Sequence, residues 1–209
     1  MPARGPRPSA PRPTVIVFVK EPRPGRVKTR LARGVGRIEA ARWYRAQALA
    51  GLRRLAADPR FDVVLAVSPD AEGLTSRVWP AALRRIPQGR GDLGARMARA
   101  LRGPGRGRWR GPAVLIGSDI PGATPAAIAR AVRALGGAEV VFGPATDGGF
   151  WLVGVRNGAA LPARLFAGAR WSGPHALADS LATLGGRRAG FAETLADVDE
   201  AADLPGRAR

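Results

Sequence analysis

The sequence predicts an α/β fold with a mixed, mostly parallel sheet and helices on both faces. Two observations predict it: apolar runs of strand length recur along the chain, and stretches with apolar residues at helical spacing separate them. The runs at 14–19 and 113–117 carry no charge, which is typical of strands buried on both faces of a parallel sheet. We expect one domain over 14–209 and a disordered, basic, Pro-rich tail over 1–13.

Each expected element follows from its local pattern. β-Branched and apolar residues predict strands at 14–19, 61–67, 113–117, 139–143 and 150–155, and the last two are close enough to form a hairpin-like pair. Apolar residues at helical spacing predict helices at 38–57, 92–101, 124–135 and 172–184, with a short helix ending at 204. Thr124 and Pro125 supply a cap and a first-turn proline for the third of these helices.

The composition narrows the class of function. The chain has no cysteine, which excludes disulfides, thiolate metal sites and a cysteine nucleophile. Its apolar runs are too short to span a membrane and no secretory signal is recognisable, so we expect a cytoplasmic protein. The net charge of +18 raises nucleic acid as a partner, but only two of the 34 basic residues are lysines and the arginines are spread over the whole chain. A generally basic surface is the favoured interpretation.

Both lysines lie in the loop 20–30, which follows the first expected strand. Ligands of open α/β sheets bind outside the carboxyl ends of the strands, so this loop is a candidate site. Gly25 permits close backbone approach, and Lys20 and Arg30 supply cations. Lys28 and Thr29 lie where a helix N-terminus would offer free amides to a phosphate. The loop predicts a site for a diphosphate or triphosphate, with a plain basic surface loop as the alternative; it does not match a P-loop.

Two carboxylates follow later strands at the same expected edge of the sheet. Asp119 follows the end of the strand at 113–117. A carboxylate there can hold Mg²⁺ or Mn²⁺ against substrate phosphates, and the alternative is that it caps a helix. Asp147 lies in a turn with Gly148 and Gly149. It could bind an acceptor hydroxyl or act as a general base, and a simple tight turn is the alternative.

The remaining candidates lie near the C-terminus. Asp197 and Asp199 are two residues apart, so in an extended segment both could approach one cation, although spacing alone favours a helix cap. His175, the only histidine, follows Trp171 at the start of an expected helix. A catalytic or hydroxyl-binding role competes there with that of an ordinary surface residue.

Five segments together resemble the small bacterial glycosyltransferase-A-like proteins often labelled arsenosugar-pathway glycosyltransferases. They are FVKEPRPGRVKTRLA at 18–32, GDLGARM at 91–97, LIGSDIPGATP at 115–125, FGPATDGGFWLVGV at 142–155 and the DVDEAADL end. Molybdenum-cofactor guanylyltransferases and phospholactate guanylyltransferase are similar more distantly. The resemblance implies the Rossmann-like glycosyltransferase-A fold, also called the nucleotide-diphospho-sugar transferase fold.

The loop chemistry and the resemblance together predict a set of site residues. Lys28 and Asp147 are the expected catalytic residues. The other expected roles are nucleotide binding by Lys20, Gly25, Lys28, Thr29, Arg30, Gly94 and Ser118, metal binding by Asp119 and Asp199, and acceptor binding by Gly148, Gly149, Trp171 and His175. The chain departs from the family's Asp-X-Asp metal motif, because Ser118 and Ile120 flank a single Asp119.

We therefore expect a transferase that depends on Mg²⁺ or Mn²⁺ and moves a glycosyl group from a nucleotide sugar to a small acceptor. The alternative is nucleotidyl transfer, in which a nucleoside triphosphate joins a phosphorylated small molecule and pyrophosphate is released. A basic nucleic-acid-binding domain, in which the acidic turns are purely structural, is the third interpretation.

Overall fold

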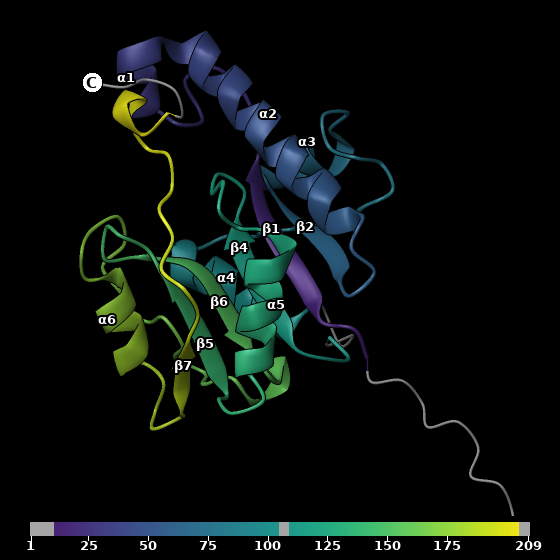
Figure 1. Cartoon of the computed structure of the whole chain (residues 1–209), viewed down its shortest axis with the longest axis vertical. Coiled ribbons are helices and arrows are strands. Elements are labelled where there is room, and N and C mark those ends of the chain that lie inside the picture. Colours follow the sequence, from purple (N-terminus) through teal and green to yellow (C-terminus); the bar gives the residue numbers. More distant parts are fainter. Residues whose placement is uncertain (1–10, 105–108, 205–209) are drawn as a thin grey trace, which may run out of the picture.

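A seven-stranded sheet forms the centre of the computed structural model, which describes residues 11–104 and 109–204 (Figure 1). The strand order is β3-β2-β1-β4-β6-β5-β7, and only β6 runs antiparallel to its neighbours. The strands are β1 (Thr14–Lys20), β2 (Asp62–Ser68), β3 (Arg84–Pro87), β4 (Ala113–Gly117), β5 (Val140–Pro144), β6 (Phe150–Val155) and β7 (Ala189–Phe191). The expected mixed, mostly parallel sheet is confirmed, including the antiparallel pairing of β5 with β6.

Helices cover both faces of the sheet, as expected. The helices are α1 (Leu31–Val35), α2 (Arg37–Ala56), α3 (Asp70–Thr75), α4 (Leu93–Arg102), α5 (Pro125–Ala134) and α6 (Ala176–Ala182), with 3₁₀ turns at Gly158–Ala160 and Ala201–Asp203. Side chains of α2 and α5, such as Leu52 and Ile128, enter one hydrophobic core. Side chains of α4 and α6, such as Leu101 and Leu181, belong to the core on the opposite face. The sheet therefore separates two cores, and the helices that cover its faces leave the ends of the strands available for a site.

Several expected elements differ in detail from the structure. The helix expected at 172–184 begins only at Ala176, because Ser172 has a left-handed backbone (φ 63°) that a helix cannot include. The helix expected to end at 204 is the 3₁₀ turn Ala201–Asp203. The sequence predicts no strand at β3 or β7 and no helix at α3, and for α1 it predicts only a helix start near Lys28. Of the expected tail, residues 1–10 lie outside the described part of the chain.

The carboxyl ends of β1, β4 and β5 meet at one edge of the sheet, and the antiparallel β6 begins there. The chain returns to this edge after β7, where Leu195 N donates to Pro144 O (3.1 Å). Figure 1 shows the C-terminal segment running from β7 past this edge to α1. The loops after β1, β4 and β5 and the C-terminal segment therefore meet in space. None of the described helices is long and apolar enough to cross a membrane.

Candidate functional site

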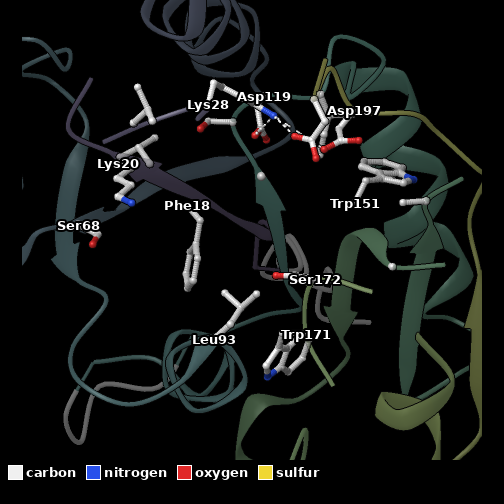
Figure 2. Close-up of a pocket in the computed structure, with 18 of the residues that line it drawn as sticks. Phe18, Lys20, Lys28, Ser68, Leu93, Asp119, Trp151, Trp171, Ser172 and Asp197 are labelled. Carbon is white, nitrogen blue, oxygen red and sulfur yellow. Dashed lines mark hydrogen bonds and ion pairs between the residues drawn. The ribbon is translucent and has the colours of Figure 1, made fainter. Parts of the chain in front are cut away.

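Lys28 lies at the centre of a carboxylate cluster where these segments meet (Figure 2). Its side chain is only 6% exposed, and its Nζ lies 2.7 Å from Asp119 Oδ2, 2.9 Å from Asp199 Oδ1 and 3.8 Å from Asp197 Oδ2. Burial alone would lower the pKa of Lys28, but the charges and hydrogen bonds of Asp119 and Asp199 outweigh it and raise the pKa. Lys28 therefore stays charged in a place where water reaches it poorly.

The cluster carries more negative than positive charge. Arg30 adds a second cation, because its guanidinium lies 3.0 Å from Asp199 Oδ2. The three carboxylates exceed the two cations by one. Burial and the charge of Asp199 raise the pKa of Asp197 to about 6. Burial also acts to raise the pKa of Asp199, but the hydrogen bond and charge of Lys28 and the charge of Arg30 lower it overall. The unbalanced charge thus falls on Asp197.

We expect Asp197→Asn to stabilise the fold at neutral pH. The pKa of this carboxyl is about 6 in the folded state against an ordinary 3.8, so the folded state binds the extra proton between these values. The stability gained from this protonation of Asp197 is fully present below pH 3.8 and is lost as the pH rises through 6. Asparagine removes this loss. In the presence of EDTA, the melting temperature of the variant should exceed that of the wild type by about 2 °C at pH 8. The difference should vanish near pH 4, and a constant difference at both pH values would contradict the assignment.

Tyr44 ties three segments together beneath the loop after β1. Its buried hydroxyl accepts from Lys20 N (2.9 Å) and lies 2.9 Å from Ser118 Oγ. Tyr44 and Ser118 share a hydrogen bond in which either hydroxyl can be the donor. Ser118 also lines the cavity. Burial raises the pKa of Tyr44 to about 12, so this arrangement persists at neutral pH.

We expect Tyr44→Phe to lower the free energy of unfolding by about 1–2 kcal/mol, because Lys20 N and Ser118 lose their partner while the ring still packs in the core. Urea unfolding measures the change. Ser118→Ala should cost less, since the phenol can still accept from Lys20 N. The double variant should lose less than the sum of the two single losses, as residues that share a hydrogen bond do. Strict additivity would show that the two hydroxyls are not coupled.

The turn that holds Asp147 is fixed from both sides. Gly149 N donates to Asp147 Oδ1 (2.9 Å), which leaves the other carboxylate oxygen without a hydrogen bond among the described residues. Gly148 has φ 85°, and a Cβ at this position would lie 2.4 Å from Pro174 O. Leu177 N also donates to Gly148 O (3.1 Å). Gly148 thus holds the turn against the segment before α6, and Asp147 is exposed.

A cavity of about 810 Å³ joins these features. Ten of the predicted site residues line it: Lys20, Lys28, Thr29, Arg30, Ser118, Asp119, Asp147, Gly149, Trp171 and Asp199. Four others lie outside its lining. Gly25 is on an exposed turn, Gly94 is covered by Phe166 and Trp171, Gly148 packs on Pro174, and His175 is exposed just before α6. Roles for these four in binding remain predictions.

Lys28 and Thr29 lie just before a helix N-terminus and do not open the helix themselves. The helix that follows, α1, begins at Leu31 and has only five residues. Lys28 instead adopts a left-handed backbone (φ 45°), which turns its side chain toward the carboxylates. Proline and glycine in the loop indicated an irregular backbone, but no local pattern specified this turn.

The sequence interpretation missed two contributors to the site. Asp197 was considered only with Asp199 as a cap or cation site, and its contact with Lys28 depends on a chain crossing that no local pattern shows. Tyr44 lies on the buried face of α2, within the helix that the sequence predicts at 38–57. The available signal was that a buried tyrosine hydroxyl needs a hydrogen-bonding partner.

The donor set suits a divalent metal shared with a substrate. The described residues contain no group of three or more His, Asp or Glu side chains placed to hold a metal ion, and Lys28 fills the centre between the carboxylates. Mg²⁺ is commonly held by one or two carboxylates together with substrate phosphates, so a complete protein cage is not required. The nearest oxygens of Asp119 and Asp199 both contact Lys28 Nζ, and the cluster has excess negative charge, so these two carboxylates are the ones that could hold such a metal beside Lys28.

Known structures share this fold. A protein from Desulfovibrio desulfuricans G20 assigned as a nucleotide-diphospho-sugar transferase is 28% identical, with a TM-score of 0.76 over 90% of this chain and 82% of that chain. CMP:2-keto-3-deoxy-manno-octonic acid synthetase, complexed with CTP, is 12% identical, with a TM-score of 0.53 over 91% of this chain and 94% of its own. Rv0371c from Mycobacterium tuberculosis H37Rv, in complex with manganese, is 17% identical, with a TM-score of 0.51 over 93% and 96%. The expected nucleotide-diphospho-sugar transferase fold is confirmed.

A family model also matches more than half of the chain. Residues 51–173 match the model of DUF2064, described as an uncharacterized protein conserved in bacteria. A comparison with curated proteins gives no match. The matches described above include neither an arsenosugar-pathway protein nor a guanylyltransferase, so these parts of the resemblance remain predictions.

Proposed function

We propose that this chain, which belongs to the DUF2064 family, is a transferase that moves a glycosyl group from a nucleotide sugar to a small acceptor. The observation that carries the proposal is the buried Lys28 between Asp119 and Asp199, at the carboxyl edge of the sheet and in the wall of an 810 Å³ cavity. Cations and a carboxylate-held metal at one place can stabilise the negative charge of a departing diphosphate. The assigned activity of the Desulfovibrio protein supports the same class.

The cations at one side of the cavity would bind the diphosphate of the donor. Lys20 and Thr29 are exposed and line the cavity beside Lys28 and Arg30. Among the described residues Lys20 has no carboxylate partner, so its charge is available to a phosphate. Ser118 supports this assignment because it adds a neutral hydroxyl to the same cavity lining. Lys28 and Arg30 are held by carboxylates before the substrate arrives, which lowers the cost of ordering them.

A divalent metal would be held by Asp119 and Asp199. When bound, Mg²⁺ or Mn²⁺ supplies a positive charge that stabilises the departing diphosphate. The manganese complex of Rv0371c supports divalent metal use in this fold. Lys28 contacts both carboxylates, so it holds them in place and adds positive charge beside the phosphates.

Asp147 is the proposed acceptor-activating residue. It lines the cavity, is exposed, and has one carboxylate oxygen free of hydrogen bonds in the described part of the chain. That oxygen can accept the proton of an acceptor hydroxyl as the hydroxyl attacks the donor. The packing of Gly148 on Pro174 would hold the Asp147 carboxylate in a fixed position in the cavity wall.

We expect Asp147→Asn to keep donor binding and to lower kcat by about 10²-fold. Asparagine retains the side-chain oxygen that accepts from Gly149 N, so the turn survives, but it cannot take a proton. Donor affinity from calorimetry and the rate of transfer should be measured on the same preparation. Unchanged transfer would reduce Asp147 to a residue of the turn.

Nucleotidyl transfer is the second candidate. The observation that favours it is that two carboxylates, one after β4 and one in the C-terminal segment, both contact Lys28 Nζ and so lie close together. Such a pair can share a metal with a triphosphate while a phosphorylated acceptor attacks the α-phosphorus and pyrophosphate leaves. The synthetase that binds CTP has this fold and supports the candidate.

A single set of measurements separates the candidates. The melting temperature of the full chain should be measured with nucleoside triphosphates, nucleotide sugars and duplex DNA, each with Mg²⁺ and with Mn²⁺. The proposal expects stabilisation by nucleotide sugars. The best donor is then incubated with the enzyme, and slow hydrolysis should release a nucleoside diphosphate. Release of pyrophosphate from a triphosphate would favour nucleotidyl transfer. Binding of DNA alone, with a steep dependence on salt, would overturn both.

A further inference from the structure

One wall of the cavity is apolar, in contrast to the charged side around Lys28. Figure 2 shows Phe18, Leu93 and Trp171 facing the space across from Lys28 and Asp119. The apolar wall consists of Phe18, Leu93, Met97, Leu115, Phe150 and Trp171. Met97 and Leu115 are buried, and the other four are partly exposed. The wall is thus the open edge of the core on the α4 side of the sheet.

The aromatic part of this wall is held rigidly. The ring of Phe150 lies 5.1 Å from that of Phe142, 6.1 Å from that of Phe166 and 6.2 Å from that of Trp171. Trp171 also packs on Gly94, where an added Cβ would lie 2.8 Å from the indole. These contacts fix the two exposed rings before any ligand binds, which is how a preformed apolar pocket gains affinity.

The apolar wall offers few polar partners. Among the polar side chains of the cavity lining, Arg96 and Gln88 are hydrogen-bonded to each other and Ser172 follows Trp171, whose buried indole Nε1 has no hydrogen-bond partner among the described residues. Arg96 already donates to Gln88 Oε1 (2.9 Å) and to Asp92 O (3.3 Å). A sugar pressed against this wall would leave several hydroxyls without partners, and each unpaired buried hydroxyl is unfavourable. An apolar group loses nothing there and is removed from water.

The wall also adjoins the turn that carries Asp147. Phe150 follows that turn directly and begins β6. The segment that carries Trp171 and Ser172 continues into Pro174, which packs on Gly148, so the turn and the apolar wall form one unit. A molecule lying on the wall would have one end beside the carboxylate of Asp147.

We propose that the apolar wall binds the acceptor, and that the acceptor is a hydroxyl compound with an aromatic or similarly apolar body. The identification of the bound compound as the acceptor rests on the proposed function. The apolar body lies against Trp171 and Phe150, and the hydroxyl is directed toward Asp147. The donor nucleotide occupies the charged side of the cavity.

Fluorescence titration with 2-naphthol, an aromatic hydroxyl compound, tests the site on the full chain. Wild type should bind it saturably, and Trp171→Ala should weaken binding by about tenfold or more. Trp171→Phe should recover most of the affinity, which separates loss of the aromatic face from loss of the fold. Phe191→Ala is the matched control, because Phe191 is an exposed aromatic residue of β7 outside the cavity lining, and it should bind as wild type does.

Competition identifies the occupant. The donor chosen by thermal shift should leave 2-naphthol binding unchanged, and methyl glucoside should not displace it. Displacement by the nucleotide would mean that the wall binds the base, and displacement by the glucoside would mean a sugar; either result overturns the proposal, as would equal binding by the Trp171→Ala variant. If 2-naphthol binds as expected but no nucleotide raises the melting temperature, the apolar site stands and the proposed function fails.

Discussion

Lys28→Ala is expected to lower kcat/KM by about 10³-fold, which corresponds to roughly 4 kcal/mol of lost transition-state stabilisation. The Lys28 side chain is 6% exposed, so the field of its ammonium is poorly screened by water. It also contacts both carboxylates that would share a metal with the substrate. Its removal therefore affects the phosphates and the position of Asp119 and Asp199 together.

The same change should lower stability, and this gives a second readout. Without Lys28 the three aspartates face only Arg30, so the excess of negative charge in the cluster rises from one to two. Repulsion among the carboxylates should raise the pKa of Asp197 further, and the pKa of Asp199 should rise because the lowering effect of Lys28 is lost. The melting temperature of Lys28→Ala should therefore fall more at pH 8 than at pH 5, because protonation relieves the repulsion.

Two variants serve as controls for Lys28→Ala. Arg33→Ala removes an exposed cation of α1 outside the cavity lining and should leave both kcat/KM and stability unchanged. Lys28→Arg keeps the charge but replaces a compact ammonium with a larger planar group, so it should recover little activity in a site this closed. Transfer at the wild-type rate by Lys28→Ala would contradict the assignment of the cluster as the site.

The fold could be predicted largely because its central elements carry local signals. Uncharged runs gave β1 and β4 to within one residue, and the cap at Thr124, whose side chain accepts from Ala127 N, marked the start of α5. The edge strands β3 and β7 have the sequences RRIP and AGF, which show neither alternation nor an apolar run. Their strand conformation comes from pairing with β2 and β5, which is a property of the assembled sheet.

The site could be predicted in part from the position of its residues relative to the expected strands. The rule that ligands bind at the carboxyl ends of strands correctly directed attention to Lys28, Asp119 and Asp147. It did not predict that Lys28 and Asp199, which are 171 positions apart, form a hydrogen bond. That contact depends on the C-terminal segment crossing the edge of the sheet after β7. The three-residue sequence of β7, AGF, has no pattern that predicts a strand.

Asp119→Asn is expected to abolish metal-dependent turnover, with kcat falling by about 10³-fold, and to leave the fold intact. The neutral amide is a poor ligand for a hard divalent cation. Stability should be preserved because, without the Asp119 carboxylate, the two remaining negative charges equal the two positive charges of Lys28 and Arg30. Thr124 caps the helix that follows, so α5 does not depend on Asp119 either.

Nucleotide affinity distinguishes this loss from simple damage to the site. In EDTA, the wild-type carboxylate of Asp119 repels the phosphates of a bound nucleotide, so Asp119→Asn should bind the nucleotide as tightly as wild type or more tightly. With Mg²⁺ or Mn²⁺, affinity should rise for wild type and not for the variant. Asp62→Asn, at the opposite end of the sheet, is the matched control and should respond to metal as wild type does. A variant at position 119 that still turned over with metal would remove this carboxylate from the mechanism, since no other described residue contacts Lys28 from the end of β4.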